Sequence, residues 1–125
     1  MKKLFLGITI FLMACGPALS SQDRNLDKFI GSLDAKIGSS RKQAFPYVSR
    51  DPSVQHQVVI VASPMIWNLA KQNRKSLINN MWKIWATHCQ SEVSNIDHCR
   101  VKVVDTSGQV VGGSRAIAGS VVYAK

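Results

Sequence analysis

The residue types best suited to chemistry in this 125-residue sequence are three cysteines and three histidines. Two of the cysteines directly follow histidines, as His88-Cys89 and His98-Cys99. Imidazole nitrogens and thiolate sulfurs both bind zinc, and two of each would complete a tetrahedral set. Neighbouring residues rarely reach the same ion, however, and the usual Cys-x-x-Cys spacing is absent. A zinc site therefore stays an alternative, and we expect no metal and no cofactor.

The third cysteine ends an apolar segment at the start of the sequence. Lys2 and Lys3 precede an apolar run over residues 4–14. A positive stub followed by a short apolar run is the pattern of a secretory signal peptide. Because the run is shorter than the ~20 residues that span a bilayer, it does not suit a permanent transmembrane helix. We therefore predict that residues 1–14 direct export.

The end of this run, Leu12-Met13-Ala14-Cys15, resembles the lipobox of bacterial lipoproteins. In that family the cysteine thiol receives a diacylglycerol, a peptidase cuts before the cysteine, and the new amine is acylated. The resemblance implies that Cys15 is lipidated and that residues 15–22 are the anchor and tether of a cell-envelope protein. Gly16, where some inner-membrane lipoproteins have aspartate, favours the outer membrane facing the periplasm. The alternative is a soluble secreted or periplasmic protein cleaved after Ser20.

Export also bears on the remaining cysteines. If Cys15 carries lipid, Cys89 and Cys99 form an even pair in an oxidising compartment, where such a pair is normally a disulfide. The bond would close a loop of about ten residues and restrict the unfolded chain. We therefore predict a Cys89–Cys99 disulfide in preference to the zinc set.

Apolar periodicity predicts an N-terminal amphipathic helix that ends near Gly38. This helix is expected to pack on its own domain or a partner, with the membrane surface as the alternative. Residues 23–53 are expected to hold the helix and an extended connection that contains Pro46 and Pro52. The apolar positions at helical spacing are Leu26, Phe29, Ile30, Leu33 and Ile37.

Residues 54–125 are predicted to form a small α+β domain. The β-branched run 57–62 predicts a buried strand, and Ser63-Pro64 is typical of a helix start. The helical pattern continues to His88 as one long helix, or breaks between Asn68 and Asn73. Strands are then expected over 100–104, 109–111 and 120–123, separated by a turn at 105–108 and a break at 112–114. The expected fold is one strand, one long helix and an antiparallel β-meander against that helix.

Trp82 is the strongest candidate for partner binding. On a helical wheel it falls between Lys71 and Lys75, outside the apolar arc, so its ring is expected at the surface between two ammonium groups. Trp67 and Trp85 lie at the edge of the arc and are expected to pack in the core.

The remaining features concern function. The 16 Lys and Arg exceed the 7 Asp and Glu, which gives a net charge of +9 that suits anionic lipid headgroups or acidic envelope polymers. His56, His88 and His98 accompany no nucleophile-elbow motif, so we expect no catalytic residues.

We therefore expect a non-enzymatic accessory lipoprotein of the cell envelope, a binding or assembly element whose partners are the membrane and another envelope protein. One alternative is a soluble exported enzyme or enzyme inhibitor that acts on envelope polymers. Another is a peripheral nucleic-acid-binding component of a DNA-transfer apparatus, since the same charge attracts nucleic acid. The oligomeric state stays open.

Overall fold

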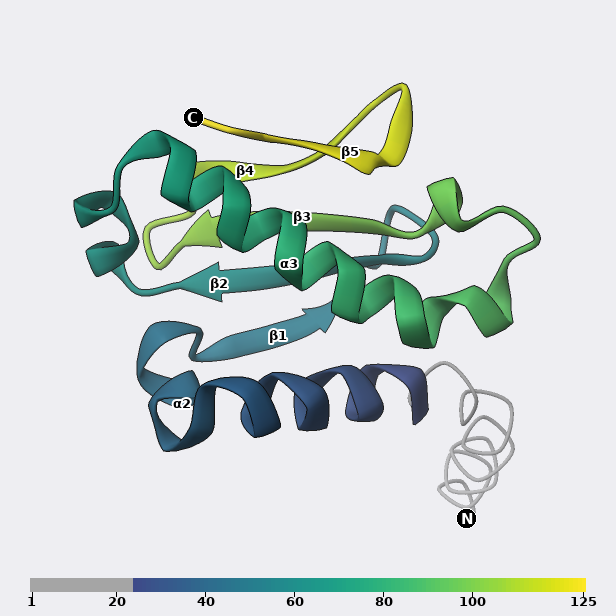
Figure 1. Cartoon of the computed structure of the whole chain (residues 1–125), viewed down its shortest axis with the longest axis horizontal. Helices are drawn as coiled ribbons and strands as arrows, with labels where there is room; N and C mark the ends of the chain where they lie inside the picture. Colours follow the sequence, from purple (N-terminus) through teal and green to yellow (C-terminus); the bar gives the residue numbers. More distant parts are fainter. Residues whose placement is uncertain (1–23) are drawn as a thin grey trace, which may run out of the picture.

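The computed structural model describes residues 24–125, so the expected lipidation site Cys15 lies outside the described residues. The described chain has the expected α+β fold, a five-stranded mixed sheet with helices packed on it (Figure 1). The strands lie side by side in chain order: β1 (Tyr47–Arg50), β2 (Gln57–Ala62), β3 (Arg100–Asp105), β4 (Val110–Arg115) and β5 (Ala118–Ala124).

The strand directions explain the place of the long helix. Strands β2 and β3 pair in parallel, whereas the other neighbours are antiparallel. Parallel neighbours need a long crossover connection, and helix α3 (Lys71–Cys89) provides it. Figure 1 shows α3 lying diagonally across the sheet, where it contacts β3, β4 and β5. The last three strands form the antiparallel meander that the sequence predicts.

The region between β2 and α3 follows the broken-helix alternative. Ser63 caps a short 3₁₀ helix, η2 (Pro64–Asn68), by accepting a hydrogen bond from the Met65 amide at 3.2 Å. Leu69 and Ala70 then take extended backbone angles before α3 begins. The chain therefore turns sharply between two helical elements.

The expected extended connection over 41–53 is partly wrong. Arg41–Ala44 form a short helix, α2, and Tyr47–Arg50 form the edge strand β1, which pairs with β2. Four residues are too few for a period-two pattern to stand out. The flanking prolines, Pro46 and Pro52, favoured a connection over a strand in the sequence, although prolines are compatible with an edge strand.

The predicted break at 112–114 is also wrong, because β4 runs through it. A Cβ atom built on Gly112 would lie 2.3 Å from the carbonyl oxygen of Tyr123 and 2.6 Å from Cδ1 of Ile78. Glycine at this position therefore lets α3 and β5 approach the strand closely, and it does not end the strand.

We expect Gly112→Ala to lower the free energy of unfolding by about 1–3 kcal/mol, since the added methyl group overpacks this contact. Gly31→Ala is the matched control, because Gly31 is an exposed helical residue with nothing within 4 Å of a built Cβ. The control should be neutral or slightly stabilising, as alanine favours helix. Urea denaturation measures both, and equal effects would contradict the overpacking argument.

Residues 24–37 are helical and lie beside β1 in Figure 1. Phe29 and Leu33 from this helix are almost fully buried, and the Phe29 ring meets the Trp85 ring of α3 edge-on, with centroids 5.5 Å apart. The helix therefore packs on its own domain and belongs to the same core as the sheet. Within residues 24–125, no helix is both long and apolar enough to cross a membrane.

Candidate functional site

A partly buried polar cluster joins four segments around Glu92, and we call Asn25, Arg50, His56 and Glu92 the Glu92 cluster. The Glu92 carboxylate accepts hydrogen bonds from Arg50 Nη1 at 3.0 Å and from Asn25 Nδ2 at 2.6 Å. His56 Nδ1 lies 2.9 Å from the same carboxylate. The cluster thus links the N-terminal helix, β1, the β1–β2 loop and the segment after α3.

Electrostatics keep this carboxylate ionised. Burial raises the pKa of Glu92, but the hydrogen bonds from Arg50, Asn25 and His56 and the Arg50 charge outweigh it, so the net pKa is lowered. Arg50 also lies over the Trp85 ring, 4.9 Å from its centroid. The cluster is thus an ion pair reinforced by hydrogen bonds, which suits a structural role.

His56 and Glu92 of the cluster lie close enough to Cys89 to be compared with a metal-ligand set, because donor atoms of all three residues lie within 4.8 Å of one another. The Cys89 sulfur, however, lies at disulfide distance from Cys99, and the Glu92 oxygens accept several hydrogen bonds. Thiolate is the form of cysteine that binds metal. These residues therefore do not fit a metal centre in the oxidised protein.

The predicted Cys89–Cys99 pairing is present at disulfide distance, with sulfur atoms 2.12 Å apart. Both residues are fully buried, and they join the last residue of α3 to the residue before β3. The alternative zinc set is not assembled. His88 instead lies 2.9 Å from the Ser32 hydroxyl, and His98 is exposed.

The expected surface position of the Trp82 ring is wrong. Its side chain is buried in the core, and its indole N–H donates to the carbonyl oxygen of Cys99 at 2.8 Å. The chain before β3 returns over this side of α3, and a helical wheel cannot show such a long-range contact. Lys71 and Lys75 are exposed in the first turns of α3, as expected, but they do not flank an exposed ring.

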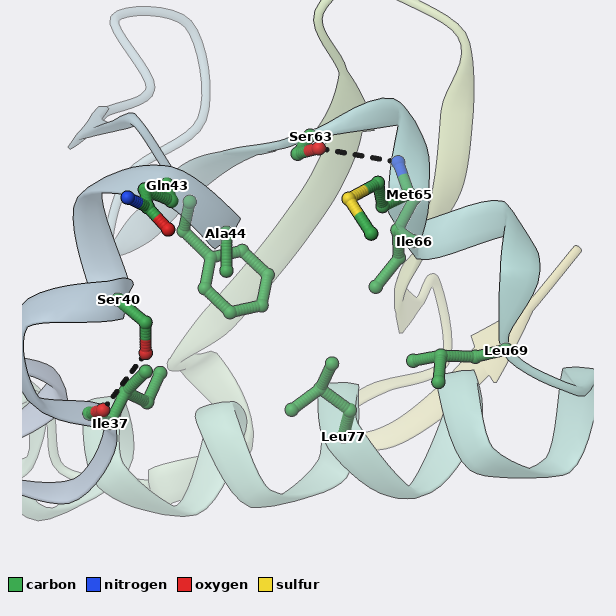
Figure 2. Close-up of a pocket in the computed structure, with 10 residues that line it drawn as sticks. Ile37, Ser40, Gln43, Ala44, Ser63, Met65, Ile66, Leu69 and Leu77 are labelled. Atoms are coloured by element: carbon green, nitrogen blue, oxygen red, sulfur yellow. Dashed lines mark hydrogen bonds between the residues drawn. The ribbon is translucent and has the colours of Figure 1, made fainter.

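An apolar groove of about 420 Å³ lies on the described surface. It lies where the end of the N-terminal helix and α2 face η2 and the start of α3. Figure 2 shows Ile37, Ala44 and Leu77 directed toward the same space as Ile66 and Leu69. The groove is lined by Ile37, Ser40, Gln43, Ala44, Phe45, Ser63, Met65, Ile66, Leu69 and Leu77.

The groove offers aliphatic surface and no charge. Met65 is 72% exposed and Leu69 is 39% exposed. Its polar side chains are few: Ser40 donates to the Ile37 carbonyl, Ser63 accepts from the Met65 amide, and Gln43 contributes one side-chain amide. An open aliphatic surface of this kind is typical of a binding site.

Sequence reasoning missed this groove. As one long helix up to His88, the chain would place Ile66 and Leu77 on the same apolar face and bury both. The break at Leu69-Ala70 was the useful sign, because apolar residues on both sides of a sharp turn can line a concave surface.

Comparison with protein-family models, curated proteins and solved structures found no match.

Proposed function

We propose that this protein is a membrane-anchored cell-envelope lipoprotein whose folded domain is a non-enzymatic binding element. The apolar groove is the observation that carries the binding role. Its uncharged aliphatic lining and its exposed Met65 and Leu69 suit recognition by burial of apolar surface. Support for the envelope setting comes from the resemblance of residues 12–15 to a lipobox and from the paired cysteines, which suit an oxidising compartment.

A binding role is preferred to catalysis because the contact that most resembles a nucleophile–base pair does not lie in the groove. The Ser32 hydroxyl lies 2.9 Å from Nε2 of His88, and this contact joins the N-terminal helix to α3. Burial lowers the pKa of His88, and the charge of Lys28 lowers it further. Neither Ser32 nor His88 lines the groove, so the contact is better explained as helix packing.

We expect Cys15→Ser to abolish incorporation of labelled palmitate into the full-length chain expressed in a bacterial host. The variant has no thiol to receive the diacylglycerol, so the uncut precursor should accumulate. Gel fluorography measures the label, and mass spectrometry identifies the N-terminus. An unlabelled wild-type chain that begins at residue 21 would contradict the anchor and support secretion instead.

A further inference from the structure

We propose that the apolar groove holds an acyl chain of an anionic membrane lipid. This inference rests on the proposed function, because the anchor would keep the groove close to a bilayer. Three features of the molecule support the proposal: the lining of the groove, the lysines near it in sequence, and the reach of the tether.

The lining favours hydrocarbon over an extended peptide. A volume of about 420 Å³ lies within the range of small-molecule sites. A peptide in the groove would need partners for its backbone N–H and C=O groups. Ser40, Gln43 and Ser63 are the only polar side chains among the described lining residues, and the Ser40 hydroxyl already donates to a main-chain carbonyl, whereas an acyl chain needs no hydrogen bonds.

The charges around the groove suit an anionic headgroup. Lys36 and Lys42 directly precede lining residues, Lys71 lies two residues after Leu69, and all three lysines are exposed. The lining itself contains no acidic residue. Nearby in the chain, Asp34 is already paired with Arg41, whose Nε lies 2.7 Å from the carboxylate. Three exposed lysines therefore lie within two residues of the lining in sequence, on the helical elements at both sides of the groove.

The tether keeps the groove within reach of the membrane. Nine Cα-to-Cα steps lead from Cys15 to Arg24, and nine steps span at most about 30 Å. The helix from residue 24 to Ile37 adds about 20 Å. A groove held this close to a bilayer meets lipid at a high effective concentration, so even weak intrinsic affinity is sufficient for occupancy.

The test uses the full chain carrying Cys15→Ser, which lacks lipid of its own. Palmitoyl-lysophosphatidylglycerol is the anionic probe, and palmitoyl-lysophosphatidylcholine is its zwitterionic counterpart with the same acyl chain. Both are titrated below their micelle concentrations. We expect saturable binding of the anionic probe and several-fold weaker binding of the other. No saturable binding of either probe would overturn the proposal.

One double variant and one control place the binding in the groove. Met65→Gln combined with Leu69→Gln should weaken binding of the anionic probe about tenfold, because both side chains lose apolar contact with the acyl chain. Ile117→Gln is the control, since Ile117 is 83% exposed on the turn between β4 and β5. Equal affinity of the double variant and this control would overturn the groove as the site.

A second set of variants tests the contact between the lysines and the headgroup. Lys42→Gln combined with Lys71→Gln should reduce binding of the anionic probe to the level of the zwitterionic one, while Lys102→Gln, an exposed residue of β3, should not. Unchanged preference in the double variant would overturn the headgroup contact. Because Cys15 is absent from these assays, failure of lipid binding is distinguishable from failure of palmitate labelling.

Discussion

Glu92→Ala is expected to lower the free energy of unfolding by about 1–3 kcal/mol. The carboxylate is 9% exposed and pairs with the Arg50 guanidinium, which is 18% exposed. The variant removes the counter-ion from a charge that stays buried, and it also removes the acceptor for Asn25. Urea denaturation followed by circular dichroism measures the loss.

Two controls show whether the buried charge is responsible. Glu92→Gln keeps the shape and one acceptor oxygen, so it should lose less than Glu92→Ala. Asp27→Ala removes an exposed carboxylate from the helix that bears Asn25 and should change stability by less than about 0.5 kcal/mol. A loss below about 1 kcal/mol for Glu92→Ala would contradict a stabilising ion pair.

The same carboxylate sets a pH dependence. The folded-state pKa of Glu92 lies below its ordinary value of 4.5, so its contribution is present above about pH 4.5 and declines as the pH falls below it. Asp105 acts at lower pH, because hydrogen bonds from Ser107 and Trp67 are the main causes that lower its pKa to about 2. Glu92→Gln should therefore flatten only the upper part of the acid transition.

Local patterns accounted for the parts of the fold that neighbouring residues determine. Ser63 caps its helical turn as predicted, and Gly108 takes the positive φ of 90° expected in the turn after β3. Both features depend on backbone conformation and hydrogen bonds within a few residues. The meander followed for the same reason, because short turns leave consecutive strands little choice except antiparallel pairing.

Long-range packing decided the features that the sequence did not reveal. Trp82 looked exposed on a wheel, but Cys99 supplies a carbonyl that its indole reaches only in the folded chain. In the sequence Gly112 resembles a strand end, because its close approach to Tyr123 and Ile78 exists only in the folded chain. The groove and the Glu92 cluster likewise arise where segments distant in sequence meet.

The Glu92 cluster and the cysteine pair form one structural unit. Donor atoms of His56 and Glu92 lie within 4.8 Å of the Cys89 sulfur. The indole N–H of Trp85 also donates to the His56 carbonyl at 3.0 Å. Loosening the end of α3 should therefore disturb the loop that holds His56 as well as the start of β3. This coupling makes the cysteine pair the second site at which a small change has a large expected effect.

The double variant Cys89→Ala with Cys99→Ala is expected to lower the free energy of unfolding by about 2–5 kcal/mol. For a domain of this size, such a loss lowers the Tm by at least about 10 °C. The unfolded chain regains freedom when a loop with a sequence separation of 10 is opened. Two buried sulfur atoms are also removed from the core. Thermal denaturation measures the shift.

Reductant separates the covalent bond from the lost packing. A phosphine reductant should lower the Tm of the wild-type chain and leave that of the double variant unchanged, because the variant has no bond to break. Cys15→Ser keeps the pair and should respond to reductant as the wild type does. If the reduced wild type, shown by alkylation to carry free thiols, melted at the same temperature as the oxidised protein, the bond would contribute nothing. Any remaining loss in the double variant would then come from core packing.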